Sequence, residues 1–284
     1  MSSSIQIKLA ALLSSVRFQN VTALLIAQLL TAKFLFEPGR SFKEILWQQR
    51  FIYMLLATSF AIAAGYIINN FYNRKRDLIN RPHLTVLESN VSTGNKLYLY
   101  FILNALSVIS ASMISLKAVL FFSVYLLLIW LYSHKWQKKA FIHEISVSLL
   151  ILYPFFGLML FFKKADTLII SGGWLFFLTL LIKEFIKNHL TIKGDVAGNI
   201  QTALTKLNEK AYKRLLTGLF TLLIPSILFI LKQTPFRFVQ YYLLFYVFLM
   251  SAVYVFYRKK NYKPAYMTIK LAIATGILSV IFIK

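Results

Sequence analysis

The sequence lacks cysteine, which excludes disulfide frameworks, thiolate metal sites and cysteine nucleophiles. Acidic residues are also scarce: the 284 residues include 9 Asp and Glu against 32 Lys and Arg, and charged residues make up 14% of the chain. In contrast, 58% of the residues are hydrophobic and the mean hydropathy is +0.66. So little charge in so apolar a chain excludes an ordinary soluble globular domain and indicates an integral membrane protein.

The formal charge of +23 raises the question of which anionic groups the Lys and Arg side chains contact. A nucleic-acid-binding protein would need this charge on one soluble face, and no stretch between the apolar runs is long enough to form a separate basic domain. The sequence also contains no Gly-rich phosphate loop, Ser-His-Asp arrangement or zinc motif. We therefore expect no nucleic-acid partner. We expect the Lys and Arg side chains to contact anionic lipid headgroups or phosphate.

Apolar stretches long enough to cross a hydrocarbon core of about 30 Å recur between short basic segments. They predict an all-α polytopic membrane protein, a single domain over residues 1–284 with about nine transmembrane helices. The third and fourth stretches are separated only by Leu116 and Lys117, which favours a tight helical hairpin over one broken helix. The predicted spans cover residues 18–36, 51–70, 97–115, 117–132, 142–162, 167–186, 213–231, 238–257 and 265–283.

The Lys and Arg residues are distributed unequally between the two sides that these spans define. About two thirds of them lie on the side of the N-terminus, and short cytoplasmic loops have such an excess. This predicts a cytoplasmic N-terminus in the plasma (inner) membrane of a prokaryote. The two longest polar segments, about 71–96 and 187–212, lie on the same side. Irregular polar sequence gathers at one face where it caps a cavity or binds a partner, so we expect the chemistry there.

Polar residues recur at helical spacing where the second and sixth predicted spans end. If the second helix continues past residue 70, then Asn69, Asn73 and Asp77 follow at i, i+4 and i+8 on one face. The sixth span ends similarly, with polar side chains at i, i+3 and i+7 and a glycine that is expected to end the helix. These residues are Asn188, Thr191 and Asp195, with Gly194 as the glycine.

The two segments resemble the signatures of the UbiA superfamily of intramembrane prenyltransferases. The first signature runs from an Asn-Asp pair through two further Asp into Asn-Arg-Pro, and the second runs from a basic-Glu pair through three Asp, with Gly before the last. The resemblance extends over the whole chain in order, with a weaker match of Arg17 and Asn20 at the first span. The matching residues are Asn69, Asp77, Asn80, Arg81 and Pro82 in the first segment and Lys183, Glu184, Lys187, Gly194, Asp195 and Thr202 in or after the second.

The resemblance implies a helical bundle in which carboxylates of both motifs hold Mg²⁺ ions that bridge a prenyl diphosphate. An acceptor captures the prenyl group when the diphosphate leaves. On this resemblance, the catalytic and metal-binding positions are Asp77, Asp195, Asn69 and Asn73. The substrate-binding positions are Arg81, Lys183, Lys187, Asn188, Thr191 and Asn20.

The sequence departs from the family pattern at four Asp positions, which are Asn70, Asn73, Asn188 and Thr191 here. Neutral oxygens can coordinate Mg²⁺, but they attract it less than carboxylates do. Two outcomes remain open for such a site. In the first, the two remaining Asp with Asn69 and Asn73 hold a single Mg²⁺ at a weakened site. In the second, the anion is bound directly by Arg74, Lys75, Arg76, Arg81, Lys183 and Lys187.

Two functional hypotheses follow for the chain. The first is a prenyltransferase that binds an isoprenoid diphosphate and transfers the prenyl group to a lipid-soluble acceptor. The second is a non-catalytic homologue, a pseudoenzyme that binds isoprenoid or other lipids or serves as an assembly subunit. The loss of carboxylates favours the second, and the retained Asn69, Asp77, Arg81 and Asp195 favour the first. A transporter unrelated to the family is a third possibility, and membrane lipids are expected partners in each case.

Overall fold

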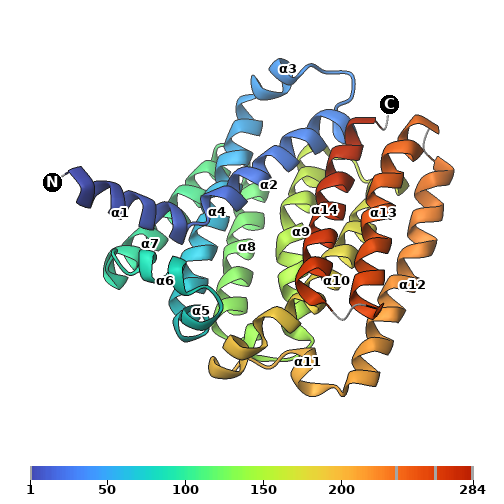
Figure 1. The fold of residues 1–284 in the computed structure, drawn as a ribbon. Helices are drawn as coiled ribbons and strands as arrows, with labels where there is room; N and C mark the ends of the chain where they lie inside the picture. The colour runs from blue at the N-terminus through green and yellow to red at the C-terminus, as the bar shows by residue number, and fades with distance from the viewer. Residues whose placement is uncertain (1, 234–235, 259–260, 283–284) are drawn as a thin grey trace. The chain divides into compact units, whose positions relative to one another are not determined.

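The computed structural model describes residues 2–233, 236–258 and 261–282, which form helices with short connections (Figure 1). Among these residues, seven helices are long and apolar enough to cross a membrane. The other two predicted spans correspond to α7 (Thr93–Ser112) and α13 (Phe236–Arg258), which are helices of 20 and 23 residues. The predicted all-α integral membrane protein is therefore confirmed. Residue 283, the last of the final predicted span, lies outside the described residues.

The third and fourth predicted spans form a helical hairpin. Helix α7 ends at Ser112, and α8 (Leu116–His134) begins after a short connection and packs against it. The hydroxyl of Ser115 caps α8, because it accepts a hydrogen bond from the backbone N–H of Ala118 at 3.2 Å. The connection is thus a capped turn between two separate helices.

The helices form two compact units, which we describe separately. Unit 1 consists of Met1–Ile26, Phe42–Lys139 and Lys193–Ile200. Its helices are α1 (Ser2–Ser15), the first part of α2 (Phe18–Thr31), α3 (Phe42–Leu46), α4 (Gln49–Tyr72), α5 (Arg74–Asn80), α6 (Pro82–Glu88), α7, α8, the 3₁₀ turn η2 (Trp136–Lys138) and the last turn of α10 (Thr167–Ala197).

Small residues on α4 determine how unit 1 packs. Helix α4 lies beside α7 and α8, and buried alanines along α4 allow this close approach. The hydroxyl of Ser107 donates to the carbonyl of Ala57 at 2.8 Å, which joins α7 to α4. Gly65 faces Ile129 of α8 so closely that a Cβ atom at Gly65 would lie 2.9 Å from the isoleucine side chain. The packing holds α4 firmly, and α4 leads directly into the first polar motif.

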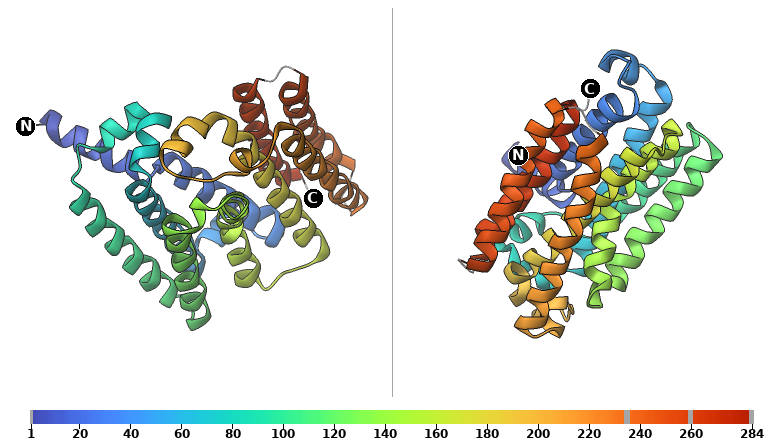
Figure 2. Two further views of the ribbon diagram at one scale, coloured as in Figure 1. Left: turned by 90° about the horizontal axis from the view of Figure 1, so that it is seen from below. Right: turned by 90° about the vertical axis from the view of Figure 1, so that its right-hand side faces the viewer.

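Unit 2 consists of Ala27–Ser41, Ala140–Ile192 and Gln201–Lys284. Its core is formed by apolar side chains that recur every three or four residues on α12, such as Leu216, Leu219 and Leu223, with partners on α10, α13 and α14. Helices α13 and α14 lie side by side, as the orange-red and red helices of Figure 2 show. The elements are the π-helical turn η1 (Ala32–Phe36), α9 (Ile142–Phe162), most of α10, α11 (Ala203–Lys206), α12 (Glu209–Gln233), α13, α14 (Tyr262–Ser279) and the 3₁₀ turn η3 (Val280–Phe282).

The two polar segments expected as loops are largely helical. Residues 71–96 contain α5 and α6, and α10 continues to Ala197 before the short helix α11. Helix α10 has 31 residues, which at about 1.5 Å per residue is longer than a hydrocarbon core of about 30 Å. Its last turns can therefore extend beyond the apolar layer. Gly194 lies inside this helix, so the expectation that it ends the helix was wrong.

Candidate functional site

The first polar motif follows α4 in nearly continuous helical register. The backbone departs from helical angles at Asn73 (φ −105°, ψ 15°), yet Asn73 N–H donates to Asn69 and Asp77 N–H donates to Asn73. The i, i+4 relation predicted for Asn69, Asn73 and Asp77 is therefore present. A second departure falls at Arg81 (φ −148°, ψ 60°), because a residue that precedes proline is disfavoured in the helical region.

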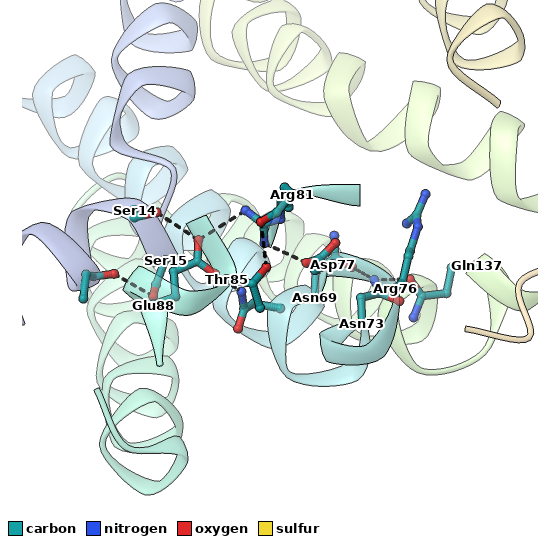
Figure 3. A network of polar contacts seen from close by, with 12 residues as sticks. Ser14, Ser15, Asn69, Asn73, Arg76, Asp77, Arg81, Thr85, Glu88 and Gln137 are labelled. Carbon is teal, nitrogen blue, oxygen red and sulfur yellow. Dashed lines mark hydrogen bonds and ion pairs between the residues drawn. The ribbon is translucent and has the colours of Figure 1, made fainter. Parts of the chain in front are cut away.

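The carboxylates of Asp77 and Glu88 both bind the guanidinium of Arg81 (Figure 3). The distances are 2.7 Å from Nη2 to Asp77 and 3.2 Å from Nη1 to Glu88. Glu88 is 1% exposed and also accepts hydrogen bonds from Ser14 and Asn70. These contacts hold α1, α4, α5 and α6 together and fix the orientation of Arg81.

The amides of Asn69 and Asn73 form a second part of this network. The Asn73 side-chain N–H₂ donates to the amide oxygen of Asn69, and it donates to Gln137 at 2.7 Å. Gln137 in turn donates to the carbonyl of Ser133 at the end of α8. The Asn69 oxygen, predicted as a metal ligand, is thus already an acceptor within the protein.

The end of the second motif reaches the first motif within unit 1. Asp195 is fully buried, and its Oδ1 lies 2.5 Å from Nε of Arg76, whose side chain is 10% exposed. Next to it, a Cβ atom on Gly194 would collide with the side-chain amide of Asn80. The absence of a side chain at Gly194 therefore allows α10 to approach α5, and the ion pair joins them.

A third cationic group lies where α1 meets α2. Arg17 has a positive φ of 48°, a conformation that is unfavourable for a residue other than glycine. Its guanidinium carbon lies 4.9 Å from the centre of the Tyr66 ring, and Asn20 donates to the Tyr66 hydroxyl at 3.3 Å. Burial and the nearby Arg81 lower the pKa of Arg17 from its usual value. Tyr66 therefore contacts both Arg17 and Asn20.

The remaining predicted residues lie in unit 2 and make contacts there. Lys183 and Lys187 bind the two oxygens of the buried Glu184, at 2.9 and 2.8 Å. The hydroxyl of Thr191 donates to the carbonyl of Lys187 at 3.4 Å. In this unit the two lysines therefore balance a carboxylate of their own helix.

Asn188 contacts a carboxylate that the sequence analysis did not single out. Its side-chain amide donates to Glu144 at 2.7 Å, and the same oxygen accepts the backbone N–H of Ala203 at 2.8 Å. Glu144 is fully buried at the start of α9. It therefore ties the first residue of α11 to α9 and α10.

The donor groups present do not fit a site for two Mg²⁺ ions. Asp77 is paired with Arg81 and Asp195 with Arg76, while the amide oxygen of Asn69 already accepts a hydrogen bond. Within the described part of the chain, no three His, Cys, Asp or Glu residues are grouped as metal ligands would be. The arrangement instead presents guanidinium groups held in place by carboxylates, which suits direct binding of phosphate oxygens.

Sequence reasoning missed the partners that neutralise the motif carboxylates. Arg76 had appeared as one cation of a basic run, and Glu88 and Glu144 are isolated acidic residues without a motif. Their scarcity is the one available signal: in a chain with 9 acidic residues, each Glu in an apolar helix needs a buried partner.

Comparisons with known proteins agree with this architecture. A model of the UbiA prenyltransferase family matches residues 22–274. A digeranylgeranylglyceryl phosphate synthase of Thermococcus gammatolerans is 28% identical over 236 residues, 81% of this chain and 83% of that protein. The synthase of the same name from Sulfurisphaera tokodaii is 23% identical over 57% of this chain, and the match spans 60% of its length.

Solved structures share the fold. A structure from work on digeranylgeranylglyceryl phosphate synthase in membranes superposes with a TM-score of 0.70 at 17% identity and covers 96% of this chain and 99% of that chain. A UbiA homologue from Archaeoglobus fulgidus, bound to DMAPP and Mg²⁺, has a TM-score of 0.67 at 16% identity, with 95% and 98% coverage. At these identities the likeness concerns the fold.

Proposed function

Since this chain belongs to the UbiA prenyltransferase family, we propose that it binds an isoprenoid diphosphate and transfers the prenyl group to a lipid-soluble acceptor. The observation that supports this best is that two arginines of the first motif are each held by a motif carboxylate, Arg76 by Asp195 and Arg81 by Asp77. The relatives' name describes digeranylgeranylglyceryl phosphate, which makes this lipid the first product to test.

In this proposal the anion is bound mainly by fixed cations, and Mg²⁺ binds more weakly than in the related enzymes. Each guanidinium has five N–H donors. Arg81 uses its two terminal nitrogens for Asp77 and Glu88, and its buried Nε has no hydrogen-bond partner among the described residues. Arg76 uses Nε for Asp195. The remaining donors can bind diphosphate oxygens. Asp77 and Asp195 hold these donors in place, while the Asn73 amide binds Asn69 and Gln137.

The positive charge of Arg76 and Arg81 assists the departure of the diphosphate in the proposed reaction. The bond between C1 of the prenyl chain and the bridging diphosphate oxygen breaks, and its electron pair leaves with the diphosphate. The acceptor hydroxyl oxygen forms the new bond to C1, and its proton passes to solvent. Arg76 and Arg81 stabilise the negative charge of the departing diphosphate. Asn20 beside Tyr66 in unit 1, and Lys183, Lys187, Asn188 and Thr191 within unit 2, remain predicted substrate-binding residues.

We further propose that the N-terminus and both motifs lie on the cytoplasmic side of a prokaryotic plasma membrane, based on the excess of Lys and Arg on that side. A non-catalytic isoprenoid-binding protein is the second candidate. The pairing of both motif Asp residues with arginines favours it, because a paired carboxylate is less available for Mg²⁺.

The test is an assay of diphosphate release from radiolabelled prenyl diphosphates of several chain lengths, with a geranylgeranylglyceryl phosphate acceptor. We expect release and a labelled lipid product in the wild type, and a decrease of about tenfold or more in Arg81→Gln. Lys139→Gln, which removes an exposed cation of unit 1, is the control. Binding of the diphosphate without release would favour the non-catalytic candidate, and the absence of both would refute the proposal.

A further inference from the structure

Unit 1 contains a pocket of about 190 Å³ beside the first motif. It is formed by the end of α4, by α5 and α6, and by the first turn of α7. Two cationic side chains, Arg74 and Lys96, contribute to its lining. Neither Asp77, Arg76 nor Asp195 is among the lining residues, so the pocket is separate from the arginine cluster described above.

The charges in this pocket favour an anion. Of the described residues that line it, none is acidic. Arg74 and Lys96 form no salt bridge within the described part of the chain, unlike Arg76 and Arg81. Glu88 lies outside the lining, binds the lining residue Asn70, and shares Arg81 with Asp77. Its charge attracts Lys96, but the lining itself contributes two cations and no carboxylate, so it carries an excess of positive charge.

Four hydroxyl-bearing residues accompany these cations in the lining: Thr85, Ser89, Ser92 and Thr93. The hydroxyls of Thr85 and Ser89 donate to the carbonyls of Arg81 and Val86, so those of Ser92 and Thr93 are the donors that an anion can use. Ser92 also caps α7, since its hydroxyl accepts the Asn95 N–H at 3.3 Å. The pocket thus includes the start of a 20-residue helix, where backbone N–H groups favour negative charge. Burial lowers the pKa of Lys96, an effect that Glu88 opposes, and a bound anion would favour its charged form.

The other part of the lining is apolar. It consists of Ile67 and Phe71 at the end of α4, Val91 before α7, and Leu97 at its first turn. The neighbouring α4 and α7 pack against each other, and α4 is a membrane-spanning candidate. A ligand with a phosphate group and an apolar chain matches both parts of this lining.

We propose that this pocket binds the phosphate group of a lipid phosphomonoester, with Arg74 and Lys96 as its charge partners. The Ser92 and Thr93 hydroxyls and the start of α7 donate hydrogen bonds to the phosphate, and the apolar lining contacts the beginning of the lipid chain. The acceptor in the proposed function is itself a lipid phosphomonoester, so as an acceptor site this inference rests on the proposed function. Binding is measured without the reaction, however, and a protein without transferase activity would still have this site.

The test is native mass spectrometry of the detergent-solubilised full chain with dioleoyl phosphatidic acid, with dioleoylglycerol, which lacks the phosphate, and with inorganic phosphate. We expect phosphatidic acid to bind about tenfold more tightly than dioleoylglycerol, and Arg74→Gln and Lys96→Gln each to weaken it about tenfold. Lys139→Gln removes an exposed cation of unit 1 outside the pocket and should change the affinity by less than about twofold.

Lysine acetylation provides a second measurement that needs no variant. Phosphatidic acid should slow acetylation of Lys96 in the wild type and leave that of Lys139 unchanged. Protection by phosphatidic acid alone identifies a lipid headgroup, and equal protection by inorganic phosphate identifies the free phosphate group; both support the site. Equal binding of phosphatidic acid and dioleoylglycerol, or unchanged acetylation of Lys96, would overturn the proposal, whatever the outcome of the transferase assay.

Discussion

The ion pair between Arg76 and Asp195 allows a strong prediction of stability. Its two atoms lie 2.5 Å apart, and the side chains are 10% and 0% exposed. Replacement of Arg76 by Met or of Asp195 by Asn leaves a buried group without its partner. Removal of one member of a buried pair costs about 3–5 kcal/mol, which is at least two orders of magnitude in the unfolding equilibrium. We therefore expect each single substitution to lower the free energy of unfolding by about this amount.

A double-mutant cycle separates the interaction energy of this ion pair from the other effects of each substitution. In Arg76→Met/Asp195→Asn, both charges are absent, so the loss should be smaller than the sum of the single losses by about 2 kcal/mol or more. The assay is reversible SDS unfolding in mixed micelles, followed by circular dichroism. Lys139→Met serves as the control, because this exposed side chain should change the free energy by about 0.5 kcal/mol or less. Single variants as stable as the wild type, or strictly additive losses, would refute the reasoning.

Two further substitutions test the polar contacts of each unit. Glu88→Gln retains one side-chain oxygen but removes the charge that binds Arg81. We expect the free energy of unfolding to fall by about 1–3 kcal/mol and amide hydrogen exchange in α6 to be faster than in the wild type. Unchanged exchange would contradict the role of Glu88. Tyr212→Phe removes the buried hydroxyl that donates to the Phe185 carbonyl at 2.5 Å, and we expect a loss of about 1–3 kcal/mol in the same unfolding assay. Stability equal to that of the wild type would show that this bond contributes nothing.

The sequence predicted those features that repeat along a helix. Apolar runs identified the helices, and the i, i+4 spacing of Asn69, Asn73 and Asp77 agrees with their backbone hydrogen bonds. A membrane helix must satisfy its backbone hydrogen bonds internally, so its length and polarity can be predicted from its own segment of the sequence. The extent of the helices beyond the membrane was not predicted, because residues 71–96 and 187–197 are polar but still adopt helical structure.

The sequence could not predict which charged groups meet across helices. Arg76 and Asp195 are 119 positions apart, and nothing in their spacing indicates that they form a pair. The same holds for Glu144, which binds Asn188 from another helix. The resemblance to the family identified the motif positions, while the protein's own partners for Asp77 and Asp195 required the fold.

We propose that the arginines of unit 1 bind the diphosphate largely without Mg²⁺. The most direct measurement is the affinity for a non-reactive prenyl thiolodiphosphate, determined by calorimetry with excess Mg²⁺ and again with EDTA. We expect binding in both conditions, with affinities that differ by less than about tenfold. We also expect Arg81→Gln to weaken binding in both conditions. Binding that occurs only with Mg²⁺, or that falls more than about a hundredfold in EDTA, would contradict it.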